Sequence, residues 1–296
     1  MRFTSMKTRA AILAAVLLSG CSDPAGSPQA SAEAQQPAPG TLAWALTGAW
    51  RLDPERDRWR HPAETLAFFG LEPGMTVVEI YPGRGWYTDI LAPYLARTNG
   101  KLYAATFEAA SADADAAATR AALAERLAAN PELYGAVTLT ALGPEALEIA
   151  PEGAADLVLS FRNVHTFMAG GFAEDAFASF YRALKPGGVL GVVQHRARST
   201  GLQDPQAADG YVQEEYVKAL AREAGFVFEA ASDINANPND TKDHPFGVWT
   251  LPPILATAPV GAAADPSFSS APYLAIGESD RMTLKFRKPP AAAPAP

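Results

Sequence analysis

The chain has 296 residues, of which 24 are basic and 32 acidic, so its formal net charge at pH 7 is −8. It contains no basic patch with interleaved aromatic residues, and an acidic domain repels phosphate backbones, so nucleic acid is not expected as a partner. The single cysteine excludes an internal disulfide.

The first 20 residues have the pattern of a secretory signal peptide. A basic start is followed by the apolar stretch Ala10–Leu18, which is too short to span a bilayer, since a spanning helix takes about 20 residues. The sequence LSGC, ending at Cys21, then matches a bacterial lipobox. We therefore predict a lipid attached to Cys21 and a periplasmic location. Ser22 replaces the aspartate associated with inner-membrane retention and favours the outer membrane; the alternative is a cytoplasmic protein with an apolar N-terminus.

Two segments flank the expected domain. Residues 21–40 are rich in Pro, Ala, Ser and Gln, and such a composition buries too little apolar surface to offset the entropy of ordering, so we predict a flexible tether. Residues 289–296 form a similar tail. The remaining residues, 41–288, suit one large α/β domain.

Within this domain, apolar runs alternate with amphipathic segments. We predict strands over residues 76–81, 101–107, 136–142, 155–161, 189–195, 226–234 and 282–286. We predict helices within 59–70 and over 86–97, 112–129, 174–184 and 211–224. This alternation indicates right-handed crossovers and a mainly parallel sheet.

The segment Val77–Thr88, VVEIYPGRGWYT, carries the strongest functional signal. It reads as a strand, a glycine turn and the start of a helix, which is how an open α/β sheet builds a nucleotide crevice. A side chain at Gly83 or Gly85 would keep the backbone away from a ligand. The alternative is a glycine turn that serves packing alone.

The order of these motifs resembles that of class I S-adenosylmethionine-dependent methyltransferases over residues 58–287. Glu79 to Gly85 resembles the acidic-x-Gly-x-Gly-x-Gly loop that holds the methionine half of the cofactor, and Glu108 stands where the family has an acid that binds the ribose. The sequence LKPGG, 184–188, resembles the turn before the fifth strand. The resemblance implies a Rossmann-like, seven-stranded, mostly parallel sheet with an antiparallel edge hairpin and helices on both faces.

One position departs from the family pattern. Tyr81 takes the place of the first glycine of the loop, where its ring would either cap the cofactor pocket or fill it. Two later segments, 210–226 and 235–253, resemble a subgroup of bacterial proteins described as predicted methyltransferases. The resemblance implies methyl transfer from S-adenosylmethionine to an unidentified small-molecule or peptidic acceptor.

Candidate residues for the chemistry follow the fourth and fifth strands, because ligands bind outside the carboxyl ends of a parallel sheet. We expect His165 to act as general base, since histidine is well suited to proton transfer near neutral pH. Asn163 would orient the acceptor, and Arg162 would lie near the cofactor or an acidic substrate. The alternatives are a structural histidine, an asparagine that stabilises a turn and an arginine paired with a surface acid.

Further candidates for substrate binding are His195, which closes the fifth strand, and His244 and Trp249. The last two lie in a segment, 235–253, long enough to be a lid or a binding loop; a structured surface excursion is the alternative.

Two other functions remain open at this point. One is a repurposed, non-catalytic binding lipoprotein on the same fold, which the export signal and Tyr81 favour. The other is a metal-dependent enzyme in which His165, His195 and His244 converge with Asp240 or Asp243 on one cation. No closely spaced metal motif supports the second, and the sequence leaves the oligomeric state open.

Overall fold

The structure is a computed structural model that describes residues 36–109 and 111–291. These residues form a seven-stranded sheet in the order β3-β2-β1-β4-β5-β8-β6. The first five strands of this order, β3, β2, β1, β4 and β5, run parallel to one another, and β8 pairs antiparallel with both β5 and β6. The predicted fold class, a mostly parallel Rossmann-like sheet with an antiparallel edge, is confirmed.

The strands are short and apolar, as expected for a sheet covered on both faces. The central strands alternate their side chains between two buried clusters, so that Val78 and Ile80 face one cluster and Val77 faces the other. The seven strands are β1 (Thr76–Ile80), β2 (Lys101–Thr106), β3 (Val137–Ala141), β4 (Ala155–Phe161), β5 (Leu184–His195), β6 (Val227–Ser232) and β8 (Arg281–Arg287).

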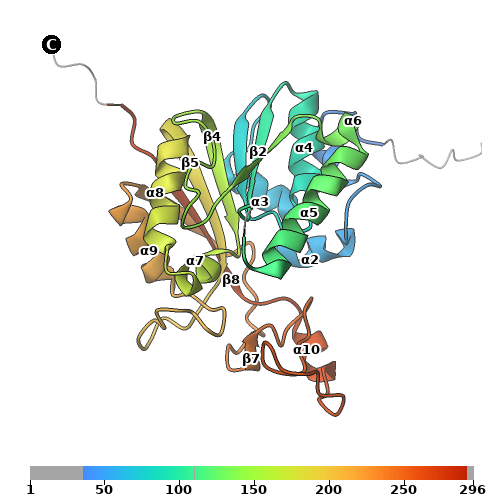
Figure 1. Ribbon diagram of the computed structural model, residues 1–296, viewed down its shortest axis with the longest axis vertical. Coiled ribbons are helices and arrows are strands. Elements are labelled where there is room, and N and C mark those ends of the chain that lie inside the picture. Colours follow the sequence, from blue (N-terminus) through green and yellow to red (C-terminus); the bar gives the residue numbers. More distant parts are fainter. Residues whose placement is uncertain (1–35, 110, 292–296) are drawn as a thin grey trace, which may run out of the picture. The chain divides into compact units, whose positions relative to one another are not determined.

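Helices cover both faces of the sheet. Figure 1 shows α8 and α9 on one side of the strands and α4, α5 and α6 on the other. The first group comprises α7 (Val164–Ala169), α8 (Ala173–Ala183) and α9 (Glu214–Glu223). The second comprises α1 (Leu42–Leu46), α3 (Pro62–Phe69), α4 (Thr88–Arg97), α5 (Ala114–Ala129) and α6 (Pro131–Tyr134). A short 3₁₀ helix, η1 (Pro54–Arg56), and α2 (Asp57–Arg60) precede α3.

Most predicted elements are present with ends moved by a few residues, and two differ more. The predicted helix 211–224 begins only at Glu214, because Val212 forms a bridge with Arg196 and donates its N–H to the carbonyl of His195 at 2.9 Å. The LKPGG segment is the start of β5 and not a separate turn before it. Helix α7, six residues long, was not predicted from sequence.

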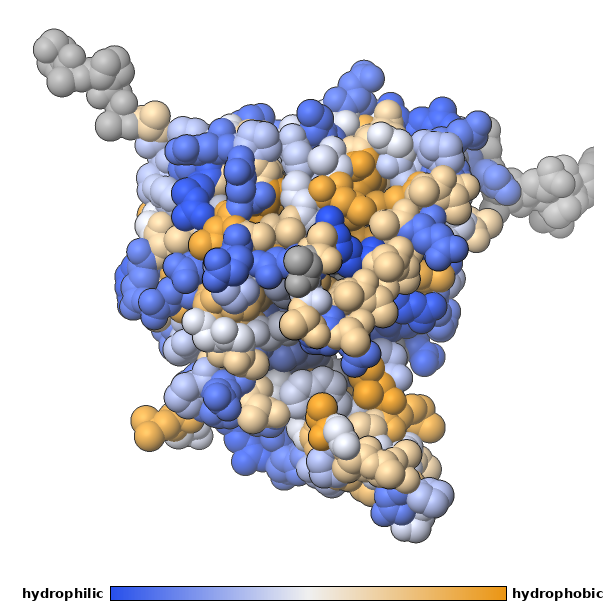
Figure 2. All heavy atoms as spheres, in the orientation of Figure 1, coloured by the Kyte–Doolittle hydropathy of each residue, from blue (hydrophilic) through white to orange (hydrophobic). Residues whose placement is uncertain are grey.

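Residues 233–280 connect β6 to β8, and we call them the insertion lobe. They contain β7 (Pro245–Val248) and α10 (Ala271–Ile276), which Figure 1 shows below the sheet, on the side where α7 lies. Three large apolar side chains of the lobe, Ile254, Val260 and Leu274, are exposed. Figure 2 shows apolar surface on the lobe beside strongly hydrophilic residues.

The predicted signal peptide, Cys21 and most of the tether lie outside the described residues, as does most of the C-terminal tail. Within the described ranges, no helix is both long and apolar enough to cross a membrane.

Candidate functional site

A cavity of about 600 Å³ lies at the carboxyl ends of the parallel strands. Its walls come from the glycine turn after β1, from the residues that follow β2 and β4, from the last residue of β5, and from η1, α2 and the insertion lobe. The side chains and backbone used below are Arg56, Arg60, Tyr81, Gly83, Phe107, Arg162, Asn163, His165, His195, Trp249, Glu278 and Ser279. The cavity therefore stands where an open α/β sheet binds its ligands.

The glycine turn leaves its backbone open to this cavity. Gly83 has a φ of +59°, a conformation that favours glycine, and a Cβ placed on it would meet no other atom within 4 Å. Gly85, with a φ of +96°, lies close to Leu123 and Thr88 instead. Of the two predicted cofactor-binding glycines, Gly83 lines the cavity and Gly85 does not.

Glu79 is buried beneath this turn. The Thr88 hydroxyl donates a 2.6 Å hydrogen bond to its Oε2 atom. Burial, aided by the charge of Asp89, raises the pKa of Glu79 to about 8, although the Thr88 hydrogen bonds oppose that rise. Its carboxyl group is consequently protonated at neutral pH and links β1 to the start of α4 without adding a charge to the cavity.

Tyr81 adopts the left-handed backbone conformation that a glycine would take at its position, with a φ of +44°. Its hydroxyl donates to the Leu142 carbonyl at 2.9 Å, and its ring lies 4.4 Å from that of Phe107. Burial, together with the charge of Glu108, raises the pKa of Tyr81. The ring is thus one wall of the cavity, and the space beside Gly83 stays open.

Glu108 forms its hydrogen bond outside the cavity. Its Oε1 atom accepts a hydrogen bond from the backbone N–H of Glu145 at 3.0 Å, and its side chain packs against Gly143. Glu108 is not among the residues that line the cavity, whereas the preceding Phe107 is. Glu108 therefore lies near Tyr81, whose pKa its charge helps to raise, but its carboxylate is bonded to Glu145 and does not line the cavity.

His165 and His195 do come together. Their ring centroids are 5.5 Å apart, and both rings line the cavity. Burial lowers the pKa of His165 to about 4, a decrease that the Gln194 hydrogen bond opposes and the charge of Arg162 reinforces. Burial, followed by the proximity of His165, also brings the pKa of His195 well below its usual value. Both rings are consequently neutral at pH 7.

Gln194 determines which nitrogen of His165 carries the hydrogen. The Gln194 carbonyl oxygen accepts from the N–H of Val164 at 3.1 Å, and its amide nitrogen donates to the carbonyl of Gly210 at 3.0 Å. These two bonds orient the amide so that its nitrogen faces Nδ1 of His165 at 3.2 Å. Nδ1 is then the acceptor and Nε2 bears the hydrogen, so His165 in this arrangement is a hydrogen-bond donor at Nε2.

His195 has a different partner. Its Nδ1 atom lies 2.5 Å from the hydroxyl oxygen of Ser279, which belongs to the insertion lobe. A serine hydroxyl both donates and accepts, so this contact is compatible with a hydrogen on Nδ1. In that tautomer the Nε2 lone pair of His195 is available to accept a proton.

Asn163 and Arg162 end β4 at the same cavity. The Asn163 amide donates to the carbonyl of Ile80 at 2.7 Å and so ties the end of β4 to the end of β1. Arg162 has a φ of +64°, and its backbone N–H donates to the carbonyl of Val193 at 2.6 Å. Burial lowers the pKa of Arg162 to about 10, while the charge of Glu278 opposes that decrease.

Trp249 brings the insertion lobe to the cavity. Its ring stands at 72° to that of His165, with centroids 6.0 Å apart. The segment 235–253 therefore contacts the histidine that the sequence placed at the reaction centre.

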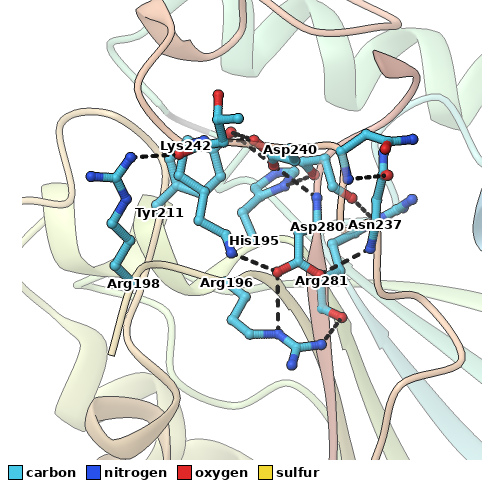
Figure 3. A network of polar contacts seen from close by, with 12 residues as sticks. His195, Arg196, Arg198, Tyr211, Asn237, Asp240, Lys242, Asp280 and Arg281 are labelled. Atoms are coloured by element: carbon cyan, nitrogen blue, oxygen red, sulfur yellow. Dashed lines mark hydrogen bonds and ion pairs between the residues drawn. The ribbon is translucent and has the colours of Figure 1, made fainter. Parts of the chain in front are cut away.

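His244, in contrast, belongs to a buried polar network of the insertion lobe. Its Nε2 atom lies 2.8 Å from the carboxylate of Asp240, which also accepts from the Tyr211 hydroxyl at 3.0 Å. Figure 3 shows Asp240 and Tyr211 in this network, next to Asp280, which pairs with Lys242 at 2.9 Å. His244 is absent from the cavity lining.

The converging cation site considered from sequence is not formed. Among residues 36–109 and 111–291, no group of three or more His, Cys, Asp or Glu side chains is placed to hold a metal ion. The physical reason is that Asp240 already bonds His244, Tyr211 and the backbone N–H of Asp280. His165 and His195 bond Gln194 and Ser279 instead.

Sequence analysis missed a group of arginines around Glu278. Arg56 contacts Oε1 of this carboxylate at 2.6 Å, and Arg60 and Arg281 contact Oε2 at 3.2 and 3.1 Å. Burial would raise the pKa of Glu278, but the surrounding guanidinium groups outweigh it and bring the pKa to about 2. The signal in the sequence is RLDPERDRWR, residues 51–60, whose arginines are unusually dense.

Comparisons with known proteins define the fold. No protein-family model matches the chain, and no curated protein matches it. Among solved structures it is similar to the [4+2]-cyclase SpnF, at 16% identity over 83% of this chain and 86% of that one, with a TM-score of 0.53. It is also similar to a protein assigned as a sarcosine dimethylglycine methyltransferase from Galdieria sulphuraria, at 16% identity over 79% and 86%, with a TM-score of 0.50.

The chain thus has the class I fold of S-adenosylmethionine-dependent methyltransferases. At such identities, similarity shows the fold alone. Because one of the two similar structures is named a cyclase and the other a methyltransferase, the reaction has to be argued from the site.

Proposed function

We propose that the protein is an S-adenosylmethionine-dependent methyltransferase that acts on a small-molecule or peptidic acceptor. The observation that carries the proposal is the cavity at the carboxyl ends of the sheet, which is lined both by the open backbone at Gly83 and by two neutral histidines. A cofactor and an acceptor need one shared cavity, because methyl transfer depends on holding the two reactants in line.

The residues of the cavity fit the cofactor. Its volume of about 600 Å³ lies within the range of small-molecule sites, roughly 300–1,000 Å³. Gly83 admits close approach of a ligand to the backbone, and Tyr81 and Phe107 offer aromatic surface to an adenine. When bound, S-adenosylmethionine supplies an electrophilic methyl group. The protein's part is to orient the acceptor, exclude water and remove a proton where the acceptor carries one.

For the proton transfer we assign the general base to His195, in place of the His165 favoured by the sequence. His195 accepts the acceptor's proton at Nε2, while its Nδ1–H donates to the Ser279 hydroxyl. His165, whose Nδ1 atom is bonded to Gln194, donates from Nε2 and orients the acceptor. Trp249, packed on His165, excludes water from the cavity.

A transfer assay with S-adenosylmethionine labelled on its methyl group and a bacterial envelope extract tests this assignment. We expect His195→Asn to slow label transfer by about 10²–10⁴-fold, the usual contribution of a general base, with unchanged binding of S-adenosylhomocysteine. His61→Asn is the control, since His61 lies outside the cavity lining and asparagine tolerates its positive φ. Full activity of His195→Asn contradicts the assignment.

A second candidate function is a binding protein that has lost catalysis. It is favoured by Tyr81, which holds a glycine's backbone conformation and is fixed by its bond to Leu142. A folded protein that binds neither S-adenosylmethionine nor S-adenosylhomocysteine would exclude the methyltransferase and favour this alternative.

We also propose that the protein is anchored in the bacterial envelope by a lipid on Cys21, facing the periplasm. The sequence LSGC after the apolar segment supports this location. Expression in bacteria fed labelled palmitate should give a labelled protein, and Cys21→Ser should abolish the label. An unlabelled wild-type protein would contradict the anchor.

A further inference from the structure

The residues around Glu278, at the cavity, carry more positive than negative charge. Four guanidinium groups, those of Arg56, Arg60, Arg162 and Arg281, act on the one carboxylate of Glu278. Two more charged residues, Asp53 and Arg84, line the cavity but are exposed and of opposite sign. The buried part of the site therefore has an excess of cations, which is costly unless an anion joins them.

Two of these guanidinium groups have nitrogen atoms without a partner. Nη2 of Arg60 and Nη2 of Arg56 are buried and form no hydrogen bond within the described part of the chain. Arg60 is only 3% exposed, and it lines the cavity. Buried donors of this kind are nearly always satisfied in folded proteins, so their presence at a cavity indicates a missing acceptor.

Arg162 adds a guanidinium group on the histidine side of the cavity. In contrast to Arg56, Arg60 and Arg281, it forms no ion pair with a carboxylate of residues 36–109 or 111–291. Its left-handed backbone, unusual for a residue with a side chain, holds it at the end of β4, beside Asn163 and three residues before His165. Burial and the neighbouring Arg281 and Arg56 both disfavour its charge.

We infer that the methyl acceptor carries an anionic group, a carboxylate or a phosphate, which Arg60 and Arg162 bind. The inference rests on the proposed function. Guanidinium groups match the planar, paired oxygen atoms of such anions. The chain itself connects this anion site to the proposed base, because Ser279, which contacts His195, follows Glu278 directly. The anion also offsets the net positive charge of the bound cofactor, whose sulfonium and ammonium groups outnumber its carboxylate.

The carboxylate of the cofactor is the competing occupant. Arg60 lies over the ring of Trp86, with its guanidinium carbon 4.6 Å from the centroid, and Trp86 directly follows the glycine turn. The test must therefore separate an anion that binds beside the cofactor from one that binds in place of it.

Calorimetric titration of the full-length protein with inorganic phosphate, at constant ionic strength, makes this separation. We expect millimolar binding to the wild type, with the same affinity within twofold when S-adenosylhomocysteine is saturating. Arg162→Gln should weaken phosphate binding at least tenfold and leave binding of S-adenosylhomocysteine unchanged. Arg198→Gln is the matched control, because Arg198 lies outside this cavity and pairs with Asp243 on the surface.

Three results would overturn the inference. The first is a wild type that does not bind phosphate, and the second is an Arg162→Gln variant that binds it as well as the wild type. The third is a protein that no longer binds phosphate when saturated with S-adenosylhomocysteine but still binds it when saturated with 5′-methylthioadenosine. Because 5′-methylthioadenosine lacks the amino-acid part, this result would assign the anion site to the carboxylate of the cofactor. If S-adenosylhomocysteine itself does not bind, the proposed function fails. Titration of the ligand-free protein with phosphate then decides whether the anion site exists.

Discussion

The two walls of the cavity differ in how their residues are brought together and in the charge they carry. The proposed cofactor wall is built mainly by one local segment, from Glu79 to Thr88, with Phe107 beside Tyr81, and its buried carboxyl group is neutral at pH 7 because burial raises the pKa of Glu79. The acceptor wall joins α2, the ends of β4 and β5, and the insertion lobe, and it holds buried guanidinium groups around Glu278.

This difference separates the two tasks of the site. A glycine-lined wall whose buried carboxyl group is neutral allows a ligand to approach the backbone closely, which needs little more than the absence of side chains. A charged wall made from distant segments selects by charge, and it depends on the whole domain being folded. Specificity for the acceptor should therefore be more sensitive than cofactor binding to changes far from the glycine turn.

The largest expected effect concerns the single carboxylate of the charged wall. Glu278→Gln leaves the guanidinium groups of Arg56, Arg60 and Arg281 without their counter-ion, and we expect it to lower the free energy of unfolding by about 3–5 kcal/mol. Urea denaturation measures this. Glu229→Gln, which removes a carboxylate paired with Lys285 and Arg287 nearer the surface, should cost no more than about 1 kcal/mol. Equal losses in the two variants would show that Glu278 does not hold the wall together.

The next effect tests the neutral histidines. Because the pKa of His165 is about 4 in the folded protein and about 6.5 in the unfolded chain, the unfolded state binds more protons between these values. Stability should be complete above pH 6.5 and fall as the pH decreases toward 4, by up to about 3 kcal/mol from His165. His165→Asn should lose less stability over that range in denaturation experiments at stepped pH. Parallel curves for variant and wild type would contradict the lowered pKa.

A smaller effect is expected at Gly83, where a substitution both strains the backbone and blocks the approach of a ligand. Gly83→Ala places a methyl group in the open space of the cavity, so we expect at least a tenfold loss of affinity for S-adenosylhomocysteine, together with about 1–2 kcal/mol of strain from its positive φ. Gly153 has nearly the same φ, +62°, and an equally open Cβ position, but it is outside the cavity. Gly153→Ala should lose similar stability and keep its affinity. An unchanged affinity in Gly83→Ala would remove this glycine from the binding wall.

The smallest effect concerns Glu108, where the sequence and the structure differ. The family pattern assigns this carboxylate to the ribose, whereas in the structure it accepts the N–H of Glu145. From the structure we expect Glu108→Ala to change the calorimetric affinity for S-adenosylhomocysteine by less than twofold. A loss of tenfold or more would mean that Glu108 turns toward the cofactor on binding and would restore the sequence-based assignment.

The sequence predicts the fold and the cofactor wall because both depend on local patterns. Apolar runs bounded by turn residues define the strands, and the spacing of Gly83 and Gly85 after β1 defines the turn. The departure at Tyr81 was also visible, although its outcome was not. Whether its ring fills or borders the cavity depends on Phe107 and on the carbonyl of Leu142, which is 61 residues away in sequence.

The acceptor wall was predicted only in part, because its contacts join distant segments. Arg162, His165 and His195 were found from their positions after strands. The role of Gln194 in fixing the His165 tautomer, and the pairing of Arg60 with Glu278 across 218 residues, have no local signature. His244 has the same residue type as His165 and lies in a loop expected to bind substrate, yet a local partner, Asp240, bonds it elsewhere.

Calorimetric titration of the full-length protein with S-adenosylhomocysteine is the decisive experiment. We expect micromolar binding, which Gly83→Ala weakens and Gly153→Ala does not. A folded wild-type protein that shows no binding would contradict the proposed function, and the cavity would then have to be assigned to a ligand other than the methyl donor.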